Sequence, residues 1–167
     1  MFYSCEYLSP IGKLTLASDG ENLVGLWIEG QKYFLNSLSD MPKTDNGLKV
    51  FAQTKHWLDR YFAGEKPLPS ELPLAPAGSE FRQTVWKYLC EIPYGETTTY
   101  KAIAERCAAD SNRASMSAHA VGGAVAHNPI SIIIPCHRVV GSDESLTGYA
   151  GGIERKIWLL KLEGAIL

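Results

Sequence analysis

The chain lacks several features that mark whole classes of protein. Its 167 residues contain no apolar run near the roughly 18 residues that a membrane-spanning helix needs. The N-terminal segment shows no basic stretch followed by an apolar core, so we expect neither a membrane association nor a signal peptide. No CxxC pair occurs among the four cysteines, which are Cys5, Cys90, Cys107 and Cys136. Free thiols of this kind are typical of a reducing compartment, and we therefore predict a cytoplasmic protein.

A surplus of positive charge is also missing. The 16 Lys and Arg residues stand against 18 Asp and Glu residues, which gives a net charge of −2. DNA-binding proteins usually carry a basic surplus, because neutralisation of phosphates dominates their affinity. Residues 111–142, however, contain no acidic residue, and their basic residues are Arg113, His119, His127, His137 and Arg138. This segment would not repel phosphate, although an ordinary neutral surface accounts for it equally well.

The first 78 residues predict a small β-sheet domain with one helix. Three segments have the alternation or the apolar run of a strand: residues 2–7, 13–18 and 23–28. Apolar residues at helical spacing over 48–62 predict a helix that Gly64 ends. Four prolines within 67–76 predict an extended linker, because proline cannot continue a helix. We therefore expect two domains, residues 1–78 and 79–167.

Residues 79–167 predict a mainly helical domain, and the chain as a whole falls in the α/β (α+β) class. Ser79 and Thr98 are candidate N-caps of two helices, the first of which Pro93 ends, and a third helix is expected from about Ser117 to His127. The third helix is rich in Ala and Gly. A short helix, a tight connection and a second helix lined by small residues form a helix-turn-helix that can lie close to a duplex. A plain helical hairpin packed in a core fits the same pattern.

The segment with the clearest chemical potential reads IIIPCHRVV. The apolar run 132–134 predicts a buried strand that Pro135 halts, with Cys136 just past its end. A thiol needs a base or a nearby positive charge to become a nucleophile. His137 is adjacent, but consecutive residues of an extended chain point to opposite sides, so we expect a water molecule to link the two. Glu163, at the end of the last helix, is a candidate to orient the histidine.

Two flanking features complete a small pocket around this sulfur. Asn128 is a turn-forming residue upstream. The glycine-rich loop 148–152 downstream can bring backbone N–H groups close to a ligand, and Tyr149 within it can stack on a planar ring. For an isolated Cys-His dipeptide, a purely structural thiol is the simpler interpretation. The strand end, thiol, histidine and glycine loop together favour a reactive site.

These motifs resemble those of the O6-alkylguanine-DNA alkyltransferases (methylated-DNA–protein-cysteine methyltransferases). The specific part is PCHRVV followed by GYAGG. The resemblance extends from about residue 81 to residue 164 through IPYG, TY, AVGGA, NP and LLKLEG. The first 78 residues match the family only in general plan. The resemblance implies a ribonuclease-H-like N-terminal domain and a winged-helix-like C-terminal domain with a helix-turn-helix.

The resemblance also implies a self-sacrificing reaction without a cofactor. The family flips an alkylated guanine out of double-stranded DNA, and its cysteine takes the alkyl group from O6 in one irreversible displacement. Carried onto this chain, Cys136 is the acceptor, His137 activates it through water, and Glu163 orients His137. Asn128 would hold the turn beside the pocket, and Tyr100 would donate a hydrogen bond toward guanine N3.

Further residues follow from the same resemblance. The substrate guanine would be held by backbone groups of Val139, Tyr149, Ala150 and Gly151. The third helix would enter the minor groove, and the DNA-binding residues would be Ser117, His119, Ala120, Gly123 and Arg138. His119 stands where the family often has an arginine that fills the gap left by the flipped base. We expect no metal, because Cys5 lacks the histidine and second cysteine of the zinc site found in some members, and we expect a monomer.

Three other interpretations remain open at this stage. A cysteine hydrolase using the same three side chains would turn over repeatedly and would need oxyanion donors. A non-catalytic lesion sensor on the same scaffold would lack the cysteine that this chain has at position 136. A plain helix-turn-helix regulator would leave the PCHR segment unexplained.

Overall fold

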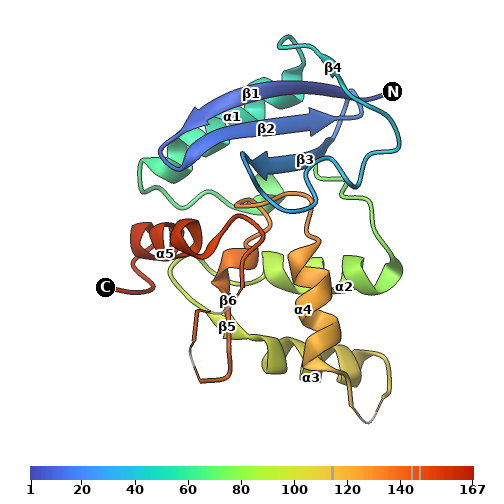
Figure 1. Ribbon diagram of the computed structural model, residues 1–167, viewed down its shortest axis with the longest axis vertical. Helices are drawn as coiled ribbons and strands as arrows, with labels where there is room; N and C mark the ends of the chain where they lie inside the picture. Colours follow the sequence, from blue (N-terminus) through green and yellow to red (C-terminus); the bar gives the residue numbers. More distant parts are fainter. Residues whose placement is uncertain (114, 144, 147) are drawn as a thin grey trace. The chain divides into compact units, whose positions relative to one another are not determined.

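The computed structural model describes residues 1–113, 115–143, 145–146 and 148–167 (Figure 1). The chain forms two compact units, which are Met1–Ala77 with Pro129–Ile133, and Gly78–Asn128 with Ile134–Leu167. The fold class is the predicted one, since the first unit contains a mainly antiparallel sheet and the second is mainly helical. Within the described ranges, no helix has both the length and the apolar character needed to span a membrane.

The sheet of the first unit has four strands in the order β3-β2-β1-β4. Their bounds are β1 Tyr3–Ser9, β2 Gly12–Ser18, β3 Leu23–Ile28 and β4 Lys43–Thr44. The three strands predicted from the sequence are confirmed, and they pair antiparallel. The two-residue β4, which the sequence did not predict, pairs parallel to β1. A tight turn joins β1 to β2, and Gly12 at its end has a φ of 117°, a conformation that favours glycine.

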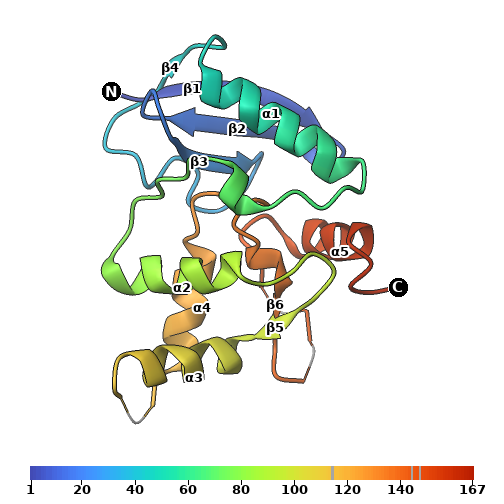
Figure 2. The ribbon, with the colours of Figure 1, turned by 180° about the vertical axis from the view of Figure 1, so that it is seen from behind.

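Helix α1 (Lys49–Phe62) covers one face of this sheet, as Figure 2 shows. It contacts β1, β2 and β3, and its residues Phe51, Leu58 and Tyr61 are fully buried. The opposite face is covered by Trp27, which packs with Ala17 and Val24. A short 3-10 turn, η1 (Pro69–Glu71), interrupts the predicted proline-rich linker.

Pro129–Ile133 belongs to the first unit although it lies far along the chain. The N–H of Leu26 donates to the carbonyl of Pro129 at 2.8 Å, and the N–H of Ser131 donates to the carbonyl of Leu26 at 3.0 Å. The hydroxyl of Ser131 donates to Oε1 of Gln31 at 3.0 Å. This segment is therefore tied to the last residues of β3, and the chain re-enters the second unit directly before the predicted acceptor cysteine.

Four α-helices and a two-stranded sheet form most of the described part of the second unit. Their bounds are α2 Glu80–Cys90, α3 Tyr100–Asp110, α4 Ala118–Ala126, α5 Ile153–Leu162, β5 Thr98–Thr99 and β6 Val139–Val140. A 3-10 turn, η2 (Cys136–Arg138), leads directly into β6. Helices α2, α3 and α4 contact one another, and the indole N–H of Trp86 on α2 donates to the carbonyl of Ala124 on α4 at 2.8 Å.

Of the two helix caps expected from the sequence, the one at Ser79 is confirmed, and the expected start of the third helix near Ser117 is also confirmed. The hydroxyl of Ser79 accepts from the N–H of Arg82, and the hydroxyl of Ser117 accepts from two N–H groups in the first turn of α4. The expected cap at Thr98 is wrong by one residue. Both Thr98 and Thr99 pair with β6, so α3 begins only at Tyr100, and the hydroxyl of Thr99 caps it by accepting from the N–H of Ala102.

Candidate active site

The chain leading to Cys136 is a series of tight turns, and the strand expected there is wrong. The N–H of Ile133 donates to the carbonyl of Ser131, and the N–H of Cys136 donates to that of Ile134, both at 2.8 Å. Ile132 has a φ of 70°, a left-handed conformation that β-branched residues rarely adopt. All three isoleucines are buried, which accounts for apolar residues at these positions. A short apolar run does not by itself distinguish a strand from another buried conformation.

Asn128 holds this turn from its upstream end. Its side-chain Nδ2 donates to the carbonyl of Ile134 at 2.8 Å, and the residue is only 3% exposed. This bond closes the loop that precedes Cys136. The Asn128 side chain also hydrogen-bonds toward the Cys136 sulfur, which favours the thiolate. The structure therefore brings the predicted turn residue into direct contact with the predicted acceptor.

The Cys136 thiol lies in the interior of the unit. Burial raises its pKa above the ordinary value, because a low-dielectric surrounding disfavours the thiolate. Hydrogen bonds from Asn128 and Tyr149 and the positive charge of Lys156 oppose this effect without cancelling it. Cys136 consequently rests as a thiol near neutral pH, and a base must remove its proton before it can act as a nucleophile.

His137 and Glu163 form a buried pair beside this thiol. The Nε2 atom of His137 lies 2.6 Å from Oε2 of Glu163, and both side chains are fully buried. Burial lowers the pKa of His137, although the neighbouring carboxylate favours the protonated ring. The imidazole is therefore held neutral and ready to accept a proton. The sequence-based pairing of these two residues matches the geometry of the structure.

The pair also fixes the tautomer of the imidazole. Burial by itself would raise the pKa of Glu163, but the hydrogen bond from His137 and the hydrogen bonds and positive charge of Arg138 lower it to about 2. A carboxylate that is ionised in this way can only accept, so Nε2 of the neutral ring carries the proton. Nδ1 then holds a lone pair, and among the described residues it has no hydrogen-bond partner. The free base of this site is therefore Nδ1 of His137.

Arg138 belongs to the same cluster, and we revise its assignment as a DNA-binding residue. It is only 6% exposed, with Nε at 2.8 Å from Oε1 and Nη2 at 3.0 Å from Oε2 of Glu163. Its Nη1 donates to the carbonyl of Ile92 at 2.6 Å. A guanidinium engaged on both sides in the interior cannot also reach a phosphate. Its place in the acid-free segment 111–142 gave no indication of this burial.

Lys156 is a site residue that the sequence reasoning missed. Its side chain is fully buried, and Nζ donates to the carbonyls of Val139 at 2.6 Å and Gly148 at 3.1 Å. Burial lowers its pKa to about 8, while the nearby Cys136 favours the charged form. The only signal in the sequence is that Lys156 stands three and four residues before the buried Leu159 and Leu160 on α5.

The glycine-rich loop contacts the histidine through Tyr149. The ring of Tyr149 meets that of His137 edge to face, with centroids 6.5 Å apart. The loop closes on itself through a 2.9 Å bond from the N–H of Gly152 to the carbonyl of Tyr149. Ala150 is partly exposed and Gly151 is buried within this loop. We call η2 together with Val139, the segment that begins at the predicted acceptor, the acceptor turn. Lys156 links the loop to this turn, because its Nζ bonds to the carbonyl of Gly148 in the loop and to that of Val139.

Tyr100 directly follows β5, the strand that pairs with β6 at the end of the acceptor turn. Strand β5 pairs parallel to β6, with Thr98 opposite Val139 and Thr99 opposite Val140. Tyr100 is the first residue of α3 and is partly buried. The parallel pairing of β5 with β6 therefore brings the start of α3 close to Val139 and Val140, which directly follow η2.

The other predicted DNA-binding residues lie on one exposed face of α4. Ser117, His119, Ala120 and Gly123 are exposed, whereas Val121, Ala124 and Val125 pack inward. A Cβ atom added at Gly122 or Gly123 would meet no atom within 4 Å. The fold itself therefore does not require glycine at either position, which leaves the approach of another molecule as a reason for the small side chains.

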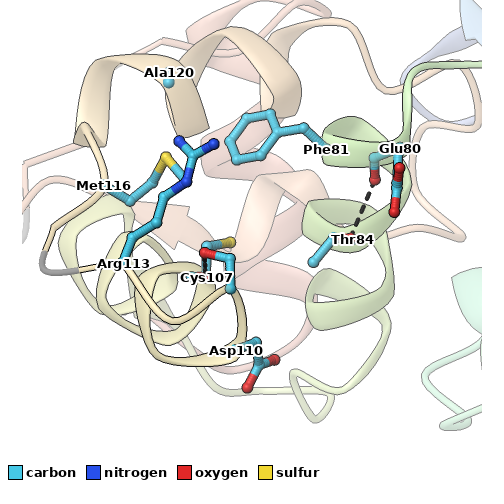
Figure 3. A pocket seen from close by; sticks show the side chains of 9 residues that line it. Glu80, Phe81, Thr84, Cys107, Asp110, Arg113, Met116 and Ala120 are labelled. Atoms are coloured by element: carbon cyan, nitrogen blue, oxygen red, sulfur yellow. Dashed lines mark hydrogen bonds between the residues drawn. The ribbon is translucent and has the colours of Figure 1, made fainter.

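A cavity of about 630 Å³ lies elsewhere in this unit, between α2, α3 and the start of α4 (Figure 3). It is lined by Glu80, Phe81, Thr84, Cys107, Asp110, Ser111, Arg113, Met116 and Ala120. Burial raises the pKa of its cysteine, Cys107, so this thiol is unreactive at neutral pH. Neither Cys136 nor His137 nor Glu163 lines this cavity, so it is separate from the candidate active site.

Two family models match almost the whole chain. The model described as 6-O-methylguanine DNA methyltransferase, ribonuclease-like domain, matches residues 2–76. The model described as 6-O-methylguanine DNA methyltransferase, DNA binding domain, matches residues 80–165.

Individual relatives are similar over nearly their full length. A methylated-DNA–protein-cysteine methyltransferase of Haemophilus influenzae is 44% identical over 163 residues, which are 96% of this chain and 86% of the relative. One of Methanosarcina barkeri is 46% identical over 157 residues, covering 93% and 92%. The crystal structure of Mycobacterium tuberculosis OGT in complex with DNA aligns with a TM-score of 0.82 at 41% identity, covering 98% of this chain and 92% of the other.

Proposed function

Because the chain belongs to the 6-O-methylguanine DNA methyltransferase family, we propose that Cys136 is the acceptor of its reaction. The protein repairs alkylated DNA directly, by transferring the alkyl group from O6 of guanine to one of its own cysteines. The observation that carries the choice of cysteine is the buried His137–Glu163 pair, with its 2.6 Å contact, directly next to Cys136.

The reaction begins with removal of the thiol proton. Nδ1 of His137 receives this proton through a bridging water molecule, and Glu163 stabilises the imidazolium that forms. The thiolate then attacks the alkyl carbon of the substrate. A bond forms between Sγ and that carbon, and the bond between the carbon and O6 breaks. The electron pair of the broken bond remains on the guanine.

The departing guanine is stabilised from its other edge. Tyr100 donates a hydrogen bond toward guanine N3, which spreads the negative charge that develops during the displacement. Backbone groups of Tyr149, Ala150 and Gly151 bind near O6, and the carbonyls of Cys136 and Val139 accept from the exocyclic amine. The contact of Lys156 with Val139 supports this part of the pocket, because it fixes the direction of that carbonyl.

The product is a thioether, and this explains why the site needs no second set of residues. Water does not hydrolyse a thioether, so Cys136 remains alkylated and each chain acts once. A hydrolase with the same three side chains would instead release its product and turn over. A lesion sensor would bind the same DNA without a reactive thiol. The presence of Cys136 favours transfer over a lesion sensor, and the family to which the chain belongs favours transfer over hydrolysis.

The DNA side of the reaction falls to α4. A base stacked in a duplex hides O6 from a thiolate, so the base must be flipped out, at a cost of a few kcal/mol that is lower for a damaged base. Helix α4 enters the minor groove with its exposed face, formed by Ser117, His119, Ala120 and Gly123. The imidazole of His119 fills the space in the stack that the flipped base leaves.

The remaining assignments concern organisation and location. Residues 1–78 form a supporting domain and residues 79–167 the domain that binds DNA and accepts the alkyl group. The protein acts as a monomer in the cytoplasm. The four free cysteines support this location, because such thiols persist in a reducing compartment.

A substitution of the acceptor separates the two roles of the second domain. Cys136→Ser should abolish methyl transfer from a duplex with one O6-methylguanine, while the dissociation constant for that duplex stays within about twofold of the wild-type value. The serine is nearly isosteric, and α4 is unchanged. Cys107→Ser is the matched control and should transfer normally. Retained transfer in Cys136→Ser would place the acceptor elsewhere, and lost binding would show that the two roles are not separable.

A further inference from the structure

Arg113 starts from a backbone position that is fixed on the end of α3. The N–H of Asn112 donates to the carbonyl of Ala109 at 3.3 Å, and the N–H of Arg113 donates to that of Ala108 at 2.9 Å. Asn112 has a φ of 59°, so the two bonds form a Schellman motif. The origin of the Arg113 side chain is therefore set by the helix end.

The side chain of Arg113 extends toward α4. It lines the cavity of about 630 Å³ together with Ala120, which is on the exposed face of α4. Figure 3 shows its guanidinium directed toward Met116 and the ring of Phe81. Arg113 is itself exposed, so the charge lies at the open side of the cavity, next to the helix face that we assign to DNA.

The guanidinium of Arg113 is available for an external anion. In the part of the chain that the structure describes, it forms no ion pair with a carboxylate, in contrast to Arg106, which pairs with Glu91 at 3.0 Å. Two carboxylates, those of Glu80 and Asp110, line the same cavity. In Figure 3, Asp110 lies on the side of the cavity away from Ala120. Among Glu80, Asp110 and Arg113, the guanidinium of Arg113 lies nearest to α4.

We propose that Arg113 binds a backbone phosphate of the DNA strand that α4 contacts. The proposal rests on the proposed function, because it takes the exposed face of α4 as the DNA-facing surface. An arginine suits this partner, since its planar fork matches two phosphate oxygens and its charge is permanent. Residues 111–142 carry no acidic side chain that would oppose the approach.

The test measures duplex affinity as a function of salt concentration for Arg113→Gln. Loss of one phosphate contact should reduce the slope of log K against log salt by about 0.9, which corresponds to about eightfold weaker binding at roughly 0.1 M salt. The loss should be equal for an undamaged duplex and for one with O6-methylguanine, because phosphates carry no sequence information. Arg113→Lys keeps the charge and should restore the slope.

Lys161→Gln is the matched control. Lys161 is an exposed residue in the last turn of α5, and Figures 1 and 2 both show α5 well away from the connection between α3 and α4. Its substitution removes the same charge and should leave the slope unchanged. An unchanged slope in Arg113→Gln, or an equal loss in both variants, would overturn the proposal. Methyl transfer by the wild type is measured in parallel, since its absence would refute the proposed function and not this contact alone.

Discussion

Glu163 accepts hydrogen bonds from two consecutive side chains, and this joins the acceptor turn to the end of α5. His137 and Arg138 both donate to it, the arginine through two nitrogens. All three side chains are buried. Removal of one of them would lower the stability of the fold, because a buried charge without a partner has lost its hydration without compensation. Glu163 therefore fixes the orientation of the His137 ring and also keeps Arg138 compatible with the interior.

The residues of this cluster were predictable from sequence to different degrees. Cys136, His137 and Glu163 stand in recognisable motifs, and the structure brings the histidine and glutamate together. Lys156 was not predictable, because lysine is almost never fully buried and nothing local shows which carbonyls will surround it. The burial of Arg138 was not predictable either, because its partner Glu163 lies 25 residues away in the sequence, and Arg138 was therefore expected at the DNA.

Lys156→Met tests whether the buried ammonium assists thiolate formation. The positive charge near Cys136 favours the thiolate, so its removal should slow methyl transfer about tenfold at pH 7, the equivalent of about one pKa unit of the thiol. Because the pKa of Lys156 is about 8, the wild type itself loses this charge above that pH. The ratio of wild-type to variant rates should therefore be largest below pH 8 and decrease as the pH rises further.

The control for this variant is Lys161→Met on the same helix, where the side chain is exposed. It should transfer at the wild-type rate across the pH range. Single-turnover rates with a lesion-containing duplex provide the measurement, and thermal melting confirms that both variants are folded. A folded Lys156→Met protein with a constant rate ratio from pH 6 to pH 9.5 would show that Lys156 only positions the loop.

At the scale of elements, α4 carries a conflict between stability and function. Glycine in the middle of a helix costs about 0.5–1 kcal/mol relative to alanine, yet α4 contains two adjacent glycines. Neither is required by packing, since an added Cβ would meet nothing within 4 Å. A helix that approaches DNA closely gains from small side chains on the facing side, which accounts for a less stable choice.

Gly123→Ala should therefore change stability and binding in opposite directions. The free energy of unfolding should increase by up to about 1 kcal/mol, because alanine is the better helix former. Affinity for a lesion-containing duplex should fall severalfold, because Gly123 is exposed on the face assigned to DNA and a methyl group would meet the groove. Denaturant unfolding and a binding titration measure the two effects.

Gly122→Ala is the comparison for this prediction. Gly122 is partly buried and lies one residue away around the helix, so it should show the same gain in stability with a smaller loss of affinity. If Gly123→Ala bound DNA as tightly as the wild type, the exposed face of α4 would not be the surface that meets the duplex.

The elements themselves were largely predictable where local chemistry decides them. The strands 13–18 and 23–28 follow from alternating and apolar residues, and the cap at Ser79 follows from a side chain that accepts a backbone N–H group. The strand expected at 132–134 failed, because turns and a left-handed Ile132 replace it. The cap of α3 was misplaced by one residue, because β5 pairs with β6 about 40 residues further along the chain and this pairing delays the start of the helix.

At the scale of the whole molecule, the chain crosses between its two units more than once. Pro129–Ile133 returns to the first unit through bonds to Leu26, and Ile134 begins the second unit again. A boundary drawn from the proline-rich segment alone does not show this return, because the pairing partners are remote in sequence. The second unit therefore resumes at Ile134, two residues before Cys136.

In the proposed mechanism each molecule acts once, because one alkyl group moves irreversibly to Cys136. The most direct test is peptide mass after incubation with a duplex carrying one O6-methylguanine. We predict a mass increase of one methyl group, about 14 Da, on the peptide that contains Cys136, saturating at one per chain, with the DNA restored to guanine. Methylation of another cysteine, or repair of more than one lesion per chain, would contradict the account.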